Sequence, residues 1–280
     1  RAVVDRHGNH WLGTRTGLRY LRDGQVHDLA AYASLPEDEM VLDLLEDHEG
    51  GLWVALRNVG LLRLSPDWMN FAVLQAGKPE RGGLHSNTIA DSSSDNAGGL
   101  WLMHRDGVLE HVAADGVITR YLEGSAETKK VHYASAVLAR SDGRLWLGHA
   151  YGLSLFDPAS GALRQWQADD AHAPTPVGMV DHLLHDADGN VWLSAYGGGV
   201  QWRDAEGKIL GTWASNQVDG LPAGSIEAMR LGPDDRLWLA GDFGVLRLDA
   251  GNKHFEAITG IEPGRIMGIT FSPEGELWLA

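Results

Sequence analysis

Side chains that could recognise a ligand recur at one place in a repeated pattern, a few residues after a segment such as Leu-Trp-Leu. Arginine, histidine, asparagine and aspartate can hydrogen-bond hydroxyl and carboxylate groups, and aromatic side chains offer flat faces for sugar rings. The residues selected on these grounds are Arg15, Arg57, Asn58, His104, Arg105, His149, Tyr151, Tyr196, Asp242 and Phe243. Together they predict a site for a small polar ligand, and arginines on a net-acidic chain favour an anionic or uronic-type one.

Familiar motifs for catalysis and metal binding are not found in the sequence. His48 and Glu49 are followed by two glycines, so they do not make the zinc-protease helix motif. The glycines at 197–199 lack the lysine of a phosphate loop, and no nucleophile elbow occurs. The segment 186–190 half resembles a calcium loop, but the distal bidentate glutamate is missing. Without cysteine, thiol catalysis, disulfides and zinc–thiolate sites are excluded, and we expect no cofactor and no resident metal. A metal site assembled across blades, for example from His104, His149 and His132, stays open as an alternative to turn or surface histidines.

Tryptophan marks a repeat that must position the selected residues. Seven tryptophans, each followed by Leu or Val, stand at positions 11, 53, 101, 146, 192, 238 and 278. A glycine lies three positions before the tryptophan in six copies, and Asp235 replaces it in the other. An aspartate lies six positions before it in four copies. Because glycine and aspartate tolerate a left-handed backbone, each copy predicts a tight Asp-x-x-Gly type of turn before its tryptophan.

Each copy also predicts four short antiparallel strands. Alternating segments such as 40–45 and 226–231 predict the first strand, and the tryptophan segment predicts a second strand that is apolar on both faces. Segments such as 153–157 and 163–167 predict the third and fourth strands. A strand buried on both faces needs a layer on either side, which stacked propeller blades supply.

The sequence therefore predicts an all-β fold, a β-propeller of about seven four-stranded blades, six near complete and the seventh partial. We expect a single propeller domain over residues 1–280, a fragment of a longer protein. A flat β-solenoid is a minor alternative. In a propeller the first strands line the central channel, and the second-to-third connections share one rim with the blade-to-blade connections, so loop residues there are free to bind. The blade-to-blade connections add His85, Asn87, Lys129, Lys130, His132, Tyr133, His172 and Asn216. We expect the repeated tryptophans to be core residues.

The frame Asp-x-x-Gly-x-Leu-Trp-Leu-Gly-Thr-x-x-Gly-Leu resembles the two-component regulator propeller repeat. Its cleanest copy is 6–18, and segments 83–89 and 220–226 resemble the lead-in to the first strand in that family. The resemblance covers the whole chain, although the Gly-Thr pair after the tryptophan survives only in the first copy.

The resemblance implies a periplasmic, non-catalytic sensing propeller of a bacterial signal-transduction protein. In that family such propellers precede a membrane helix and a histidine kinase or diguanylate cyclase, and many are thought to sense carbohydrates. On this basis we expect a small polar ligand such as an oligosaccharide, with attached membrane and kinase or cyclase domains in the parent protein. A homodimer is an open alternative to a monomer.

Charge and hydropathy exclude two classes of partner, nucleic acids and the interior of a membrane. The net charge of −15 repels phosphate backbones, so nucleic-acid binding is not expected. The acidic runs 37–39 and 169–170 are interpreted as solvated loop charges. No apolar run approaches the roughly 18 residues that cross a bilayer, so no membrane span is predicted.

Two other functions use the same rim. The first is a propeller lyase, similar to streptogramin lyases or to polysaccharide-degrading propellers. It would need a His/Glu or paired-carboxylate site, and we would expect a divalent metal cofactor there. His104, His149 and Asp242 are its candidates. The streptogramin lyase repeat places an aromatic residue and Thr after its tryptophan, whereas Leu or Val follows in all seven copies here, which favours the sensor. A purely protein-binding scaffold cannot be separated from the sensor on sequence.

Overall fold

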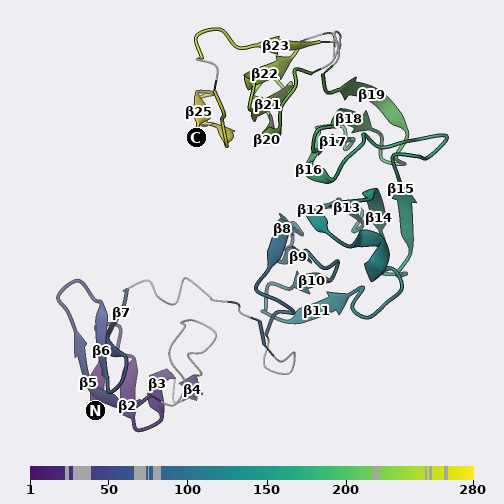
Figure 1. Cartoon of the computed structure of the whole chain (residues 1–280). Coiled ribbons are helices and arrows are strands. Elements are labelled where there is room, and N and C mark those ends of the chain that lie inside the picture. Colours follow the sequence, from purple (N-terminus) through teal and green to yellow (C-terminus); the bar gives the residue numbers. More distant parts are fainter. Residues whose placement is uncertain are drawn as a thin grey trace. The chain divides into compact units, whose positions relative to one another are not determined.

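The computed structural model in Figure 1 describes residues 1–22, 25–27, 39–65, 74, 76–77, 83–216, 221–249, 251, 254–261 and 264–280. They belong to two compact units, Arg1–Gln75 and Ala76–Ala280, and each unit is described here by itself. Glu37, Asp38 and Gly220, which the sequence analysis used, lie outside the described residues. Apart from the short 3-10 helix η3 (Thr128–Val131), the elements found in these ranges are β-strands.

The strands form seven antiparallel sheets, numbered here as blades 1 to 7 in chain order. In the first unit, blade 1 contains β1 (Ala2–Val4), β2 (His10–Thr14), β3 (Gly17–Arg22) and β4 (Gln25–His27), and blade 2 contains β5 (Val41–Glu46), β6 (Leu52–Leu56) and β7 (Gly60–Leu64). In the second unit, blade 3 contains β8 (Ile89–Ser94), β9 (Leu100–His104), β10 (Leu109–Val112) and β11 (Ile118–Tyr121), and blade 4 contains β12 (Ala134–Ala139), β13 (Leu145–His149), β14 (Gly152–Phe156) and β15 (Leu163–Trp166). Blade 5 contains β16 (Val180–His185), β17 (Val191–Ala195), β18 (Gly199–Arg203) and β19 (Ile209–Ala214). Blade 6 contains β20 (Ile226–Leu231), β21 (Leu237–Gly241), β22 (Gly244–Leu248) and β23 (Phe255–Ala257), and blade 7 contains β24 (Ile269–Phe271) and β25 (Leu277–Leu279).

This arrangement confirms the predicted blades. Within each sheet the strands pair in chain order, and every pairing in the described ranges is antiparallel. In the second unit the first strands β8, β12, β16, β20 and β24 contact one another in that order, so they form the inner edge of successive blades (Figure 1).

The residue three positions before each repeat tryptophan has a left-handed backbone in all seven copies. Its φ is 82° at Gly8, 83° at Gly143 and 59° at Asp235, the copy that lacks glycine. The predicted turn is therefore confirmed, including the role of Asp235. The β17–β18 turn of blade 5 is one residue longer than the β13–β14 turn of blade 4, and Gly197 and Gly199 both have a left-handed backbone there, with φ of 71° and 106°.

Gly143→Ala should lower the free energy of unfolding by about 1–2 kcal/mol, because an L-residue is strained at this φ. No heavy atom lies within 4 Å of the added Cβ, so the loss comes from the backbone conformation alone. Gly264→Ala is the control, since its Cβ is equally unobstructed and its φ is not positive. Urea unfolding measures both variants. Equal stability of the two would contradict a left-handed Gly143.

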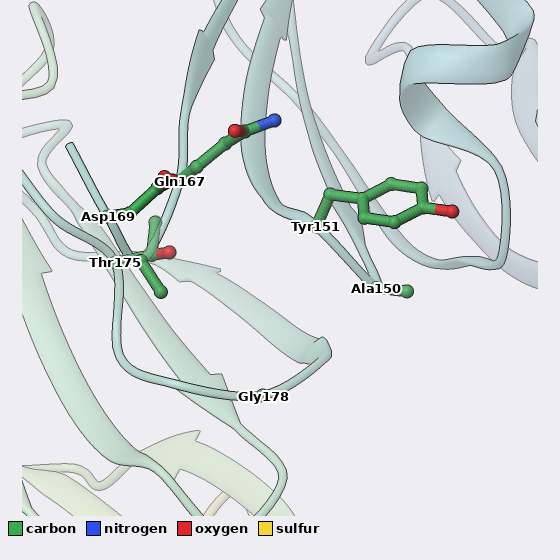
Figure 2. A pocket seen from close by; sticks show the side chains of 7 residues that line it. Ala150, Tyr151, Gln167, Asp169, Thr175 and Gly178 are labelled. Atoms are coloured by element: carbon green, nitrogen blue, oxygen red, sulfur yellow. The ribbon is translucent and has the colours of Figure 1, made fainter.

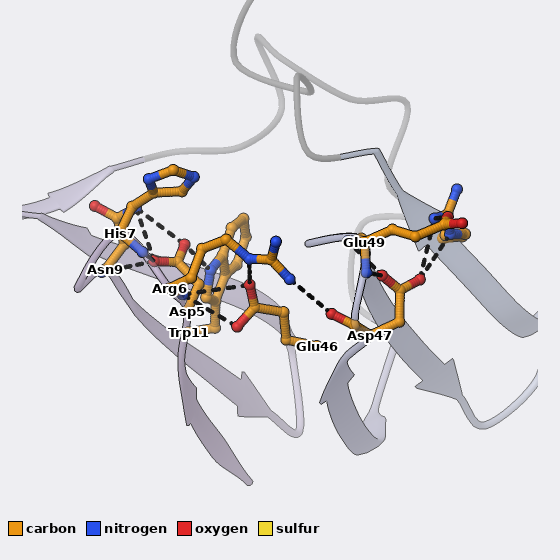
Figure 3. Close-up of polar contacts among 10 residues, drawn as sticks. Asp5, Arg6, His7, Asn9, Trp11, Glu46, Asp47 and Glu49 are labelled. Atoms are coloured by element: carbon orange, nitrogen blue, oxygen red, sulfur yellow. Dashed lines mark hydrogen bonds and ion pairs between the residues drawn. The ribbon is translucent and has the colours of Figure 1, made fainter.

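The repeated aspartate ties the turn to the tryptophan. In blade 1, Asp5 Oδ1 accepts the backbone N–H of Asn9 at 2.9 Å, and its Oδ2 accepts the indole N–H of Trp11 at 3.0 Å (Figure 3). In blade 2, Asp47 accepts the indole N–H of Trp53 at 2.8 Å. In the second unit the Oδ2 atom of the aspartate bonds a side chain of the third strand instead of the repeat tryptophan. Asp95 bonds His111, and Asp186 accepts the indole N–H of Trp202. The aspartate of the repeat is thus a structural anchor.

The apolar core lies between neighbouring blades. Trp146 packs with Leu193 of the following blade, whereas Leu145 and Leu147 on the same strand pack in the cluster of Trp101 from the preceding blade. This confirms a second strand that is apolar on both faces. The repeat tryptophans that are buried at 9% exposure or less are Trp11, Trp101, Trp146, Trp192 and Trp238. Trp53 is half-buried and Trp278 is 59% exposed, because each stands on the last blade of its unit, where no further blade of that unit covers it.

Candidate functional site

Second-to-third turns and the starts of first strands meet at one edge of the blades, as predicted. The backbone N–H of Tyr196 donates to the carbonyl of Met179 at 2.9 Å, and that of Asp242 donates to the carbonyl of Ser225 at 3.2 Å. The N–H of Ala134 likewise donates to the carbonyl of Arg105 at 3.2 Å, which joins the turn of blade 3 to the first strand of blade 4. We call this edge of the second unit the rim.

The rim carries a pocket between blades 4 and 5, with a volume of about 230 Å³. One wall is the β13–β14 turn, and the other is the connection from β15 to β16 (Figure 2). Its lining residues are Ala150, Tyr151, Gln167, Ala168, Asp169, Thr175 and Gly178. Tyr151 is 49% exposed, and Asp169, interpreted from the sequence as a solvated charge, is exposed in the pocket wall. The pocket therefore offers an aromatic face, an amide and a carboxylate together.

Thr175 gives this pocket an unmet hydrogen-bonding group. Its side chain is 4% exposed, and its hydroxyl has no hydrogen-bond partner among the described residues. A buried hydroxyl without a partner costs about 1–3 kcal/mol, so a polar ligand atom or a water that reached it would be favoured.

A buried arginine holds the pocket wall in place. Arg203 donates from Nη2 to the carbonyls of Ala173 and Pro174 at 2.9 and 2.8 Å, and Gln201 donates to the Pro174 carbonyl at 3.0 Å. Arg203 is fully buried, and burial lowers its pKa to about 10, so it remains charged at neutral pH. The roles of Arg203 and Gln201 were not predicted from the sequence. These two side chains fix the backbone on which Thr175 stands.

His149 is fully buried and is not among the residues that line the pocket. Its Nδ1 accepts the N–H of Tyr151 at 3.2 Å, so its Nε2 carries the proton and donates to Ser154 Oγ at 2.8 Å. Burial lowers the pKa of His149 to about 4, so the ring is neutral at physiological pH. His149, which was predicted to contact a ligand, thus stabilises the turn that carries Tyr151.

His104 belongs to a buried charge network on blade 3. Its Nε2 donates to Glu110 Oε2 at 2.7 Å, and both side chains are fully buried. Arg120 donates to the other oxygen of Glu110 at 2.7 Å, and so does the backbone N–H of His85 at 2.9 Å. His85 in turn bonds Asp106 at 2.7 Å. Partial burial raises the pKa of Asp106, but the hydrogen bonds from His85 and Val108 and the charges of His85 and His104 together outweigh it, so the pKa lies below the ordinary value. The sequence-selected His85 and His104 therefore meet here.

The remaining selected residues are exposed or half-buried turn residues. In the first unit Arg15, Arg57 and Asn58 lie in the β2–β3 and β6–β7 turns, and Asn58 bonds Glu39 at 3.2 Å. In the second unit the exposed residues are Arg105, Tyr196 and Asp242, and Phe243 is half-buried. Asp242 accepts the N–H of Ser225 at 2.9 Å. Ligand contact by any of these residues stays a prediction.

A second cavity, not predicted from the sequence, lies on the inner edge of the second unit. Its volume is about 290 Å³, and its side chains come from the first strands of blades 3 to 6. The lining is mainly polar: Asp91, Ser135, Asp181, His182 and Arg230. Within the described part of the chain, no group of three or more His, Asp or Glu side chains is arranged to hold a metal ion.

No family model and no curated protein sequence matches the chain. Solved structures do match it. The extracellular domain of BT3049 of B. thetaiotaomicron, a proposed hybrid two-component system, is 20% identical with a TM-score of 0.61, over 99% of this chain and 38% of that one. The extracellular domain of BT4673 of the same organism, also a proposed hybrid two-component system, is 17% identical with a TM-score of 0.58, over 99% and 38%. Virginiamycin B lyase from Staphylococcus aureus is 19% identical with a TM-score of 0.53, over 100% and 90%.

These likenesses concern the fold. The chain spans little more than a third of the length of the two extracellular domains and nearly all of the lyase. No helix in the described ranges has the length and hydropathy needed to cross a bilayer. The chain is therefore a β-propeller, and the solved structures that share its fold include extracellular domains of two-component systems, the class that its tryptophan repeat resembles.

Proposed function

We propose that this propeller is a non-catalytic, extracytoplasmic ligand-sensing domain of a bacterial signal-transduction protein, which recognises a small polar ligand such as an oligosaccharide at the rim. The observation that carries the proposal is the pocket between blades 4 and 5, where the buried, unpartnered hydroxyl of Thr175 lies in the same lining as the exposed ring of Tyr151. An aromatic face beside hydrogen-bonding groups is suited to a sugar ring.

The surroundings of the pocket support a binding role. Arg203 and Gln201 hold the connection from β15 to β16 by bonds to its carbonyls, so the wall is preorganised. The fold is shared with extracellular domains of proposed two-component systems, which supports a periplasmic location and attached membrane and kinase or cyclase domains in the parent protein. A homodimer would be compatible with such an assembly.

Thermal unfolding of this chain with neutral and acidic oligosaccharides tests the proposal. Maltotriose, xylotriose, cellotriose and oligogalacturonides form the panel. A ligand at about 100 times its Kd adds about 2.7 kcal/mol to stability, which for a domain of 150–250 residues raises Tm by about 5–10 °C. Tyr151→Ala should weaken the response by up to about tenfold in ligand concentration, since contact with an aromatic ring contributes about 0.5–1.5 kcal/mol.

Val117→Ala is the matched control, because Val117 is 58% exposed in the β10–β11 turn at the other end of its strands. The control should respond like the unmodified protein. A response that Tyr151→Ala leaves unchanged would place the ligand elsewhere, and no response to any sugar would remove the oligosaccharide from the proposal.

A lyase is the second candidate function, because virginiamycin B lyase matches over 90% of its own length. Its nominated rim residues do not form a catalytic group here: His104 and His149 are fully buried in separate blades, and Asp242 bonds the backbone of Ser225. The sensor therefore has the stronger support.

A further inference from the structure

The cavity at the inner edge of blades 3 to 6 is built by a recurring β-bulge. The pairing of first and second strands shifts register between Ile89 and Asp91 in blade 3, and between Val180 and His182 in blade 5. At such a bulge two residues oppose one on the partner strand, so the usual alternation of side chains is broken. Asp181 and His182 consequently both line the cavity, although they are neighbours in sequence.

His182 is positively charged in this arrangement. Its Nε2 lies 3.1 Å from the carbonyl of Glu227, and its Nδ1 lies 3.1 Å from Asp181 Oδ1 and 3.0 Å from Ser194 Oγ. Ser194 donates its own proton to Asp181 at 2.8 Å, so both ring nitrogens face acceptors and both must donate. Burial lowers the pKa of His182, but the hydrogen bond and charge of Asp181, the Glu227 carbonyl and the charge of Asp91 together outweigh burial, so the pKa is raised. Asp181 and His182 thus neutralise each other.

Asp91 and Arg230 both line the cavity, and neither makes a direct ion pair with a described residue, although the charges of His182 and Arg230 both act on Asp91. Among the described residues no ion pair within 4.0 Å involves either side chain. Asp91 accepts the N–H of Val137 at 2.9 Å, and its burial raises the pKa of its carboxyl group. Arg230 donates from Nη1 to the carbonyl of Met229 at 2.9 Å, which leaves its other N–H groups for a ligand.

Other charges near the cavity are already paired. Glu227, which follows Ile226 on β20, accepts Arg265 at 2.6 Å, and Arg265 also lies 3.6 Å from Asp242. The cavity of about 290 Å³ therefore presents a carboxylate and a guanidinium that make no direct ion pair in the described part of the chain. This volume is at the lower end of the roughly 300–1,000 Å³ of small-molecule sites.

We propose that this cavity binds a small zwitterion, a free α-amino acid, with its ammonium group on Asp91 and its carboxylate on Arg230. Charge-assisted bonds at both ends would complete the two unpaired groups, and the serine and aspartate beside them would hydrogen-bond a short polar side chain. The site does not depend on the rim pocket, which lies on different residues.

Isothermal titration calorimetry with L-serine and L-alanine tests the site. L-alaninamide, which lacks the carboxylate, and N-acetyl-L-alanine, which lacks the ammonium group, are the matched probes. We expect the amino acids to bind, and each altered probe to bind about tenfold or more weakly, because each loses a charge-assisted hydrogen bond. Asp91→Asn and Arg230→Gln should weaken amino-acid binding by a similar factor.

Both variants keep a group for the existing backbone bond: the asparagine oxygen can accept from Val137, and the glutamine amide can donate to Met229. Circular dichroism and thermal unfolding confirm that they remain folded. Arg236→Gln is the control, since Arg236 pairs with Asp234 at 2.6 Å in the β20–β21 turn, and it should bind as the unmodified protein does. Equal binding of all four probes, or no heat from any of them at millimolar concentration, would overturn the proposal.

Discussion

Glu110→Gln should lower the free energy of unfolding by about 3–5 kcal/mol, the cost of breaking a buried ion pair by removing one partner. Glu110 is fully buried and accepts hydrogen bonds from His104, Arg120 and the N–H of His85. A glutamine has nearly the same shape, but its NH₂ group must face one of these donors. Arg120, only 14% exposed, would keep its charge with only the more distant Glu123, at 3.9 Å, as a carboxylate partner.

Glu256→Gln provides the comparison, because Glu256 is 58% exposed and only 3.7 Å from Arg247. An exposed pair of this kind contributes about 0–1 kcal/mol. Urea unfolding followed by tryptophan fluorescence measures both variants. If Glu110→Gln were as stable as Glu256→Gln, the network around Glu110 would not be an intact buried ion pair.

Trp146→Ala should be destabilising by a similar amount, about 3–5 kcal/mol, because removing a buried tryptophan leaves a large cavity. Its indole is fully buried between blades 4 and 5, where it packs with Trp166 at a centroid distance of 5.4 Å. Arg140 lies over the ring at 5.4 Å, so its cation–π contact is lost as well.

Trp278→Ala tests whether this cost follows from burial or from the repeat itself. Trp278 has the same place in the repeat, yet it is 59% exposed. We expect its replacement to change the free energy of unfolding by less than about 1 kcal/mol. Similar losses at the two positions would contradict the assignment of Trp146 to a core that Trp278 does not share.

The fold could be predicted from the sequence because each level of the repeat imposes the same local structure. A left-handed residue before the tryptophan requires glycine or a substitute such as Asp235. The aspartate six positions before the tryptophan accepts a backbone N–H of the turn in blades 1, 2, 3 and 5. The exposure of Trp278 could not be predicted, since it depends on whether a neighbouring blade covers the residue.

The rim was predictable as a place, but its side-chain roles were less so. Tyr151 lines a pocket, whereas His149 and His104 turn inward and bond Ser154 and Glu110. Residue type alone does not distinguish these cases, because a histidine in a turn serves a ligand and a buried partner equally well.

The inner cavity could not be predicted from the sequence because the β-bulges break the regular alternation of side chains. In a regular strand neighbouring residues such as Asp181 and His182 point to opposite faces, so they would not share a site. Their polar character within the segment 180–185, which otherwise contains valine and leucine, was the available signal.

Ligand recovery after binding tests the central claim, that the rim pocket senses a ligand without changing it. The oligosaccharide that gives the largest thermal shift is incubated overnight with the protein and then analysed by mass spectrometry, beside the same sugar with Tyr151→Ala. We predict that each chain binds a single ligand, that this ligand is recovered intact, and that Tyr151→Ala does not retain it. Cleaved or eliminated product, formed by the unmodified protein and not by the variant, would contradict the sensor and identify a lyase.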